Sequence, residues 1–190
     1  MFIQTEQTPN PASLKFLPGQ PVAAAGGVQI ESAGAAAEAS PLAARLFAVG
    51  GVTAVYLGAD FITVTKSDDR PWPVLKPELL GAIMDHYTSG EATLVAAAGQ
   101  VSGADGAPGQ AAAGDDGIVA QIKELIETRV RPAVAQDGGD IVFQSFESGV
   151  VYLHMRGACA GCPSSTATLK MGIENMLKHY VPEVTAVEAV

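Results

Sequence analysis

The feature that most limits how this chain can fold is a segment in its middle that lacks large apolar side chains. From Ala96 to Gly117 there is no aromatic residue, no Ile and no Leu, and the only charged residues are acidic. Such a segment buries too little apolar surface to offset the conformational entropy lost on ordering it. We therefore predict a flexible Ala/Gly-rich linker over residues 91–117 that joins two small domains, at residues 1–90 and 118–190.

Residues 1–90 alternate between strand and helix patterns, which predicts a small α+β domain. This part of the chain contains no cysteine and no glycine-rich phosphate loop. The expected elements, in chain order, are strands at Phe2–Glu6 and Ser13–Leu17, a helix from Pro41 to about Val49, strands at Val52–Leu57 and Phe61–Lys66, and a helix from Pro73 or Pro77 to Tyr87.

Residues 118–190 predict a second α+β domain with the element order α-β-β-α-β. Apolar residues recur at helical spacing from Ile118 to Val130, and Pro132 is expected to kink or end this first helix. The later elements are a turn at Gln136–Asp140, strands at Ile141–Phe146 and Val150–Arg156, a loop at Gly157–Pro163, a helix capped by Ser164 or Ser165 that buries Leu169, Ile173, Met176 or Leu177, and Tyr180, and a strand at Val184–Val190 after Pro182.

Both cysteines of the chain, Cys159 and Cys162, lie in one CxxC motif between a strand end and a helix start. The free N–H groups and the dipole of a helix N-terminus favour the thiolate, which ligates metals and attacks disulfides. In a reducing compartment such a motif indicates a metal site or redox chemistry. Three interpretations stay open on this basis: an iron–sulfur site, a zinc site bridging a structural dimer, and a dithiol oxidoreductase. The hairpin before the motif and the absence of proline between the cysteines are unlike thioredoxin.

The number of ligands that a metal site needs indicates that both metal interpretations require a second subunit. Structural zinc sites and the common iron–sulfur clusters take about four protein ligands, and one chain offers two thiolates. The histidines are poor candidates, because His86 lies in the other domain, His154 in mid-strand and His179 near the far end of a helix. A symmetric dimer would bring four cysteines together. A cluster seated across such an interface suits transfer better than permanent electron carriage.

Charge and hydropathy argue against two classes of function. The chain has 11 basic and 20 acidic residues, a net charge of -9 and no basic cluster, which is unsuited to nucleic-acid binding. No run approaches the roughly 18 apolar residues of a membrane span. The N-terminal residues match neither a secretory signal nor a transit peptide, so a cytoplasmic location is expected, or the mitochondrial matrix if a presequence has been removed.

Three segments resemble a known family. Arg131–Asp140 and Leu153–Ser165 are similar to the C-terminal domain of NifU and Nfu-type proteins, and Gln4–Gly19 is similar to the N-terminal domain of the Nfu branch. The resemblance implies a non-enzymatic carrier whose Cys159 and Cys162 bind a [4Fe–4S] cluster bridged between two subunits. It also implies a homodimer when loaded, an upstream assembly scaffold as donor and apo iron–sulfur proteins as recipients. The N-terminal domain would serve partner recognition, and the Asp137–Asp140 turn either caps a helix or contacts the cluster.

Overall fold

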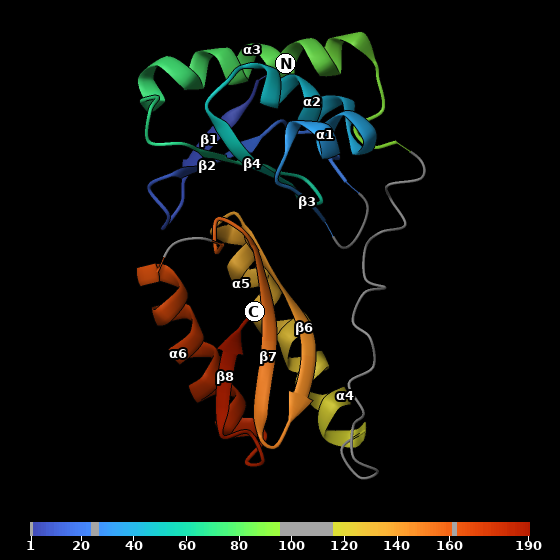
Figure 1. Cartoon of the computed structure of the whole chain (residues 1–190). Helices are drawn as coiled ribbons and strands as arrows, with labels where there is room; N and C mark the ends of the chain where they lie inside the picture. The colour runs from blue at the N-terminus through green and yellow to red at the C-terminus, as the bar shows by residue number, and fades with distance from the viewer. Residues whose placement is uncertain (1, 24–26, 96–115, 161–162) are drawn as a thin grey trace. The chain divides into compact units, whose positions relative to one another are not determined.

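The computed structural model describes residues 2–23, 27–95, 116–160 and 163–190, and it divides the chain into two compact units, Met1–Gly103 and Ala104–Val190 (Figure 1). Each unit has its own hydrophobic core of helices packed on a sheet, so the predicted α+β fold class is confirmed. None of the described helices is long and apolar enough to cross a bilayer. The predicted domain boundaries stay predictions, and most of the predicted linker, residues 96–115, lies outside the described residues.

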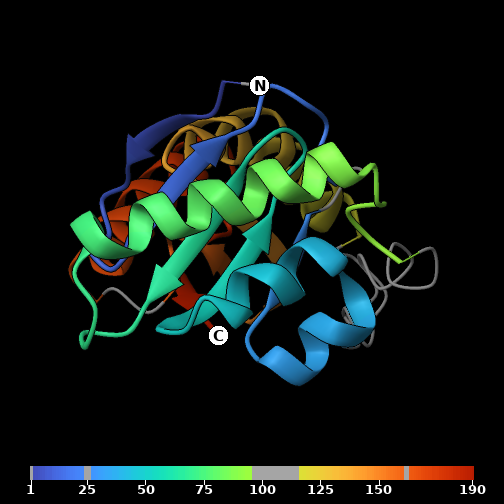
Figure 2. The ribbon, with the colours of Figure 1, turned by 90° about the horizontal axis from the view of Figure 1, so that it is seen from above.

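The sheet of the N-terminal unit has five strands in the order β1-β2-β5-β4-β3. All neighbouring strands are antiparallel, and β1 and β3 form the edges. Helix α3 crosses over the strands, and it buries Leu75, Leu79 and Ile83 in the core (Figure 2). The elements are β1 (Gln4–Gln7), β2 (Ser13–Leu17), β3 (Val28–Ile30), α1 (Ala33–Ala39), α2 (Pro41–Ala48), β4 (Val52–Leu57), β5 (Ile62–Lys66) and α3 (Trp72–Ser89).

The predicted elements of this unit are present with small shifts, but β3 and α1 were not predicted. Strand β3 has only three residues, and it forms because it can pair with β4. Helix α1 is alanine-rich and buries only Ala36, so it has no apolar periodicity to detect. Its start is nevertheless capped, because the Ser32 side chain accepts a hydrogen bond from the backbone N–H of Ala35.

Residues 91–95, which we assigned to the linker, lie against the N-terminal unit. Glu91 forms an ion pair with Arg45 of α2 at 2.8 Å, and the backbone N–H of Val95 donates to the carbonyl of Ala39 at 2.9 Å. The packed part of this unit therefore extends beyond residue 90.

The C-terminal unit has a three-stranded sheet in the order β6-β7-β8. Strands β6 and β7 form an antiparallel hairpin, whose turn residues Ser148 and Gly149 have φ angles of 52° and 84°. Strand β8 is parallel to β7, and the crossover between them is helix α6. The elements are α4 (Asp116–Leu125), a π-helical turn η2 (Ile126–Val130), α5 (Arg131–Gln136), β6 (Gly139–Glu147), β7 (Val150–Gly157), α6 (Pro163–Tyr180) and β8 (Ala186–Ala189).

One of our two predictions for Pro132, that it ends the first helix of this unit, is wrong, because helical structure continues past it. The regular α-helix ends earlier, at Leu125, and the π-helical turn η2 leads into α5, which holds Pro132 in its first turn. The backbone N–H of Arg131 donates to the carbonyl of Ile126, five residues back. The wider turn absorbs the lost N–H of the proline and the clash of its ring with the preceding turn.

Two predictions for helix α6 are wrong. The helix begins at Pro163, so Ser164 and Ser165 lie inside its first turn and not before it. Tyr180 is exposed, with the guanidinium of Arg129 4.9 Å from its ring centroid. Val181, which is 1% exposed, takes the buried position after Ile173 and Leu177 at the same helical spacing.

Candidate functional site

Cys159 lies in the loop that leaves the end of strand β7. The strand ends at Gly157, whose φ of 64° turns the backbone, and the N–H of Ala160 donates to the carbonyl of Gly157 at 3.1 Å. Helix α6 begins four residues after Cys159. Cys162 lies outside the described residues, so of the predicted pair the structure places Cys159 alone.

The side chain of Cys159 points into the core of the C-terminal unit. It is 7% exposed and belongs to the apolar cluster that α5, α6 and the sheet enclose. Gly139 and Gly157 face each other at the end of the β6–β7 ladder. A Cβ atom added at Gly139 would overlap with the sulfur of Cys159 and lie 3.0 Å from the carbonyl oxygen of Arg156. The absence of a side chain at Gly139 therefore makes the space that the sulfur occupies.

The backbone around Cys159 is held from two sides. The N–H of Ala158 donates to the carbonyl of Gly138 at 3.1 Å, which joins the loop to the turn before β6. The hydroxyl of Thr166 donates to the carbonyl of Cys159 at 3.1 Å, which joins the loop to the first turns of α6. The position of this cysteine is thus fixed by both neighbouring elements.

Burial raises the pKa of the Cys159 thiol to about 12, and the carboxylates of Asp137 and Asp140 add to this effect. Our expectation that the helix N-terminus holds this cysteine as a thiolate is therefore wrong for the isolated chain. Cys159 lies four residues before the start of α6, whereas the helix dipole acts over the first turn, so burial is the main influence on this thiol. This raised pKa favours the neutral thiol over the thiolate at Cys159.

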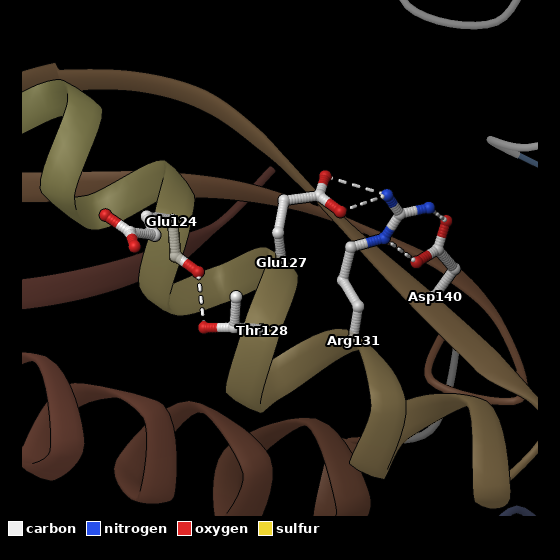
Figure 3. A network of polar contacts seen from close by, with 5 residues as sticks. All are labelled: Glu124, Glu127, Thr128, Arg131 and Asp140. Atoms are coloured by element: carbon white, nitrogen blue, oxygen red, sulfur yellow. Dashed lines mark hydrogen bonds and ion pairs between the residues drawn. The ribbon is translucent and has the colours of Figure 1, made fainter.

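An ion-pair network fixes the turn that faces the cysteine (Figure 3). The guanidinium of Arg131 binds both carboxylate oxygens of Asp140, with Nε 2.7 Å from Oδ1 and Nη2 3.0 Å from Oδ2. Its Nη1 also lies 2.8 and 2.9 Å from the two oxygens of Glu127, one helical turn earlier. These partners raise the pKa of Arg131. Because the Asp140 side chain is only 6% exposed, this pair ties the start of α5 to the start of β6.

The Asp137–Asp140 turn combines three structural roles, and the cluster contact that we kept as an alternative stays a prediction. Asp137 ends α5, where its N–H donates to the carbonyl of Val134. Gly138 supplies the positive φ of 79° that the turn requires. Gly139 already belongs to β6 and supplies space. The signal for the last role was in the sequence, since a turn that needs one positive φ does not need two glycines.

The three histidines of the chain were not expected to be ligands. His86 is buried on α3 of the other unit. His154 is exposed on β7, with Nδ1 3.0 Å from the carbonyl oxygen of Val190, and His179 stacks edge-on against Tyr180 near the end of α6. Within the described residues, no group of three or more His, Cys, Asp or Glu side chains could hold a metal ion.

Comparison with known proteins finds a matching domain family for each of the two units. Residues 122–188 match the NifU-like domain family, and residues 3–90 match the N-terminal domain of scaffold protein Nfu/NifU. The chain is 53% and 52% identical to NifU-like proteins 4 and 5, both mitochondrial, from Arabidopsis thaliana, over 99% of this chain and 65% and 67% of theirs. It is 50% identical, over 100% of this chain, to a mitochondrial NFU1 iron-sulfur cluster scaffold homolog from Drosophila persimilis, of which it covers 65%.

These relatives contradict one prediction. A cytoplasmic location was expected from the first residues of the sequence, whereas all three relatives are named mitochondrial. The chain spans about two thirds of the length of these relatives.

Proposed function

The chain belongs to the NifU-like family with an Nfu-type N-terminal domain, and on this premise we propose that it carries an iron–sulfur cluster from one protein to another. Family membership supports a role in iron–sulfur cluster assembly. The observation that carries the proposal is that both cysteines of the chain fall, in the sequence, between the end of β7 at Gly157 and the start of α6 at Pro163. Thiolate sulfur is the ligand that iron–sulfur clusters require. The cluster is cargo in this proposal, and no catalytic residue is assigned.

In the proposed loaded form, two chains share one [4Fe–4S] cluster through Cys159 and Cys162 of each. One chain offers half of the roughly four thiolates that such a cluster takes. A two-fold symmetric dimer supplies the other half with the same loop.

The surface of α6 beside the loop supports this pairing. Its outward positions Ala167, Thr168, Met171, Gly172 and Asn175 are exposed and uncharged, and Met171 is 66% exposed. The charged residues of this helix are engaged elsewhere, since Lys170 pairs with Glu188 and Lys178 with Glu174. Two copies of a chain with a net charge of -9 repel each other least where they meet through uncharged faces.

The surroundings of Cys159 favour temporary over permanent binding. Loading must bring its sulfur out of the core and remove its proton, since the ligand is the thiolate. The carboxylates of Asp137 and Asp140, which raise the pKa of this thiol, also oppose the negative charge of a thiolate-bound cluster. A site that binds its cargo against these costs releases it readily to a recipient with better placed thiolates.

Anaerobic reconstitution with iron and sulfide tests the proposal. We expect about four iron and four sulfide atoms per two chains, and a change from monomer to dimer in analytical ultracentrifugation on loading. Loaded chain should then activate an apo [4Fe–4S] enzyme faster than free iron and sulfide do. Thr53→Ser, an exposed position in the other unit, serves as the matched control for the Cys159→Ser, Cys162→Ser double variant.

Three results would contradict the proposal. The first is iron binding by the double cysteine variant at the wild-type level. The second is zinc that survives purification in place of iron, which favours the zinc-bridged structural dimer. The third is catalytic turnover of a model disulfide, which favours the dithiol oxidoreductase. The high pKa of Cys159 makes the third result the least expected, because the thiolate is the attacking form.

A further inference from the structure

The N-terminal unit contains a groove that the proposed carrier function does not use. It lies between the edge strand β1 and the first turn of α3, and it has a volume of about 580 Å³. We call it the Trp72 groove. Its walls include Thr5 and Gln7 of β1, Pro9 and Pro11 of the following turn, and Trp72 and Lys76 of α3. Its size falls within the range of ligand-binding pockets.

The walls of the Trp72 groove are fixed before any partner binds. The indole N–H of Trp72 donates to the carbonyl of Pro11 at 3.0 Å, so the helix is tied to the turn. Within the turn, the side chain of Asn10 accepts from the N–H of Ala12 at 3.0 Å, and the hydroxyl of Thr8 lies 2.8 Å from the carbonyl oxygen of Asn10. A surface ordered in this way loses little conformational entropy on binding.

The charge of the groove differs from that of the whole chain. None of its described lining residues carries a carboxylate, although the chain has 20 acidic residues. Its single charged residue is Lys76, which forms no ion pair within the described residues. The other cations of this unit are engaged: Lys15 with Glu6, Arg45 with Glu91, Arg70 with Glu78, and Lys66 with the carbonyl of Ser67 and the Trp72 ring. The groove therefore offers a positive charge beside an indole and three prolines.

The edge of the sheet gives the groove a second means of recognition. Among the described strands, β1 pairs with β2 alone, so the backbone N–H and C=O groups along its other side are available. An extended peptide can add to such an edge as a further strand. Thr5 and Gln7, two residues apart on β1, both line the groove, so a peptide added there would lie along it.

We propose that the Trp72 groove binds an extended peptide segment, rich in Glu or Asp and in apolar residues, on a partner protein. The peptide backbone pairs with β1, an apolar side chain packs on Trp72, and a carboxylate faces Lys76. That this partner donates or receives the cluster rests on the proposed function, whereas the binding of the peptide does not.

Trp72 makes the test specific, because it is the single tryptophan of the chain and lies in the groove. The full-length chain without iron is titrated with an acetylated, amidated ten-residue peptide of alternating Glu and Leu with a central Pro, and Trp72 fluorescence is followed. We expect a saturable change. We expect about three-fold weaker binding for Lys76→Met and about ten-fold for Lys76→Glu, since reversal adds repulsion to the lost attraction. The control Lys123→Glu, with the same charge change in the other unit, should bind the peptide within about two-fold of wild type.

Each contrary result overturns the proposal. If a peptide with every Glu replaced by Lys binds as tightly as the Glu peptide, the groove does not select for carboxylates. If Lys123→Glu weakens binding as much as Lys76→Glu does, the attraction comes from the net charge of the chain and not from the groove. If free glutamate produces the same fluorescence change, the occupant of the groove is a small acid and not a peptide. Because no iron is present, failure here leaves the carrier function standing, and failure of reconstitution leaves this binding intact.

Discussion

Two buried titratable side chains, His86 in the N-terminal unit and Cys159 in the C-terminal unit, lie in contrasting surroundings. His86 in the N-terminal unit is fully buried, and both of its ring nitrogens lack a hydrogen-bond partner within the described structure. The charges near it, Arg45 and Glu91, are paired with each other. Cys159 in the C-terminal unit is almost as buried, but a glycine, a threonine and a carboxylate–guanidinium pair define its place.

This difference separates burial that serves packing from burial that serves a site. His86 adds bulk to a core and carries an unsatisfied polar cost. Cys159 is small and adds little bulk, yet three elements of the unit converge on it. A buried polar group whose neighbours are arranged around it is the better indicator of function.

The strongest way to break the arrangement around Cys159 is to remove Arg131. Arg131→Met is expected to lower the free energy of unfolding of the C-terminal unit by about 3 kcal/mol, because the buried carboxylate of Asp140 loses its guanidinium. Hydrogen exchange of the unit, followed by mass spectrometry, measures the change. Lys178→Met is the matched control, since it breaks the more exposed pair with Glu174 and should cost about 0.5 kcal/mol or less. If both variants lose the same free energy of unfolding, the buried Arg131–Asp140 pair stabilises the unit no more than the exposed Lys178–Glu174 pair does.

The second test addresses the contact between Gly139 and the sulfur of Cys159. Gly139→Ala is expected to destabilise the C-terminal unit by about 2 kcal/mol through overpacking. Adding Cys159→Ala should restore part of this loss, because it removes the nearest atom that the new methyl group meets, while the carbonyl oxygen of Arg156 at 3.0 Å remains. Gly172→Ala is the control: that glycine has open space around it, and alanine there should stabilise α6 by about 0.5–1 kcal/mol. If Cys159→Ala restores nothing, the sulfur is not what excludes a side chain at Gly139.

The elements that could be predicted from the sequence are those with a strong local pattern. Strand β2 and strand β4 have the predicted bounds, because alternation and flanking turns define them locally. Strand β3 forms by pairing with β4, more than twenty residues later in the chain, and the three residues Val28–Ile30 are too few to show a strand pattern. The π-helical turn before Pro132 lets the helical segment continue although the proline has no N–H to donate. This turn could not be predicted from the position of the proline alone.

The candidate site was predictable as to which residues matter but not as to their state. Two cysteines in one loop could be read directly from the sequence, and their role stays a prediction because Cys162 lies outside the described residues. The neutral thiol of Cys159 could not be inferred, since it depends on burial by distant segments and on carboxylates some twenty residues earlier. The pairing of Arg131 with Asp140 likewise has no local pattern, because a turn and a helix end separate the two.

The third test concerns His86 and its dependence on pH. Burial lowers the pKa of His86 below its ordinary value of 6.5, with Arg45 adding to this and Glu91 opposing it. The unfolded chain thus binds the proton more readily, so the stability of the N-terminal unit should fall as pH decreases below about 6.5. His86→Leu should remove this slope and raise the free energy of unfolding by about 1 kcal/mol, because no unsatisfied nitrogen is left. Trp72 fluorescence in urea reports on this unit, and the hydrogen exchange of the C-terminal unit should not respond. A slope that persists in His86→Leu would assign it to other groups.

The smallest expected effect comes from the acidic neighbour of Cys159 that faces solvent. In a Cys162→Ser background, alkylation of Cys159 by iodoacetamide should be slow at pH 8 and should rise about ten-fold per pH unit, since only the thiolate reacts and the pKa of this thiol is about 12. Asp137→Asn removes one of the two charges that raise this pKa, and because Asp137 is exposed and screened the rate should rise only about two- to three-fold. Glu147→Gln, at the far end of β6, is the control and should leave the rate unchanged. If the two variants react alike, burial alone keeps the thiol neutral, and the contrast with His86 is reduced to the packing of the sulfur against Gly139.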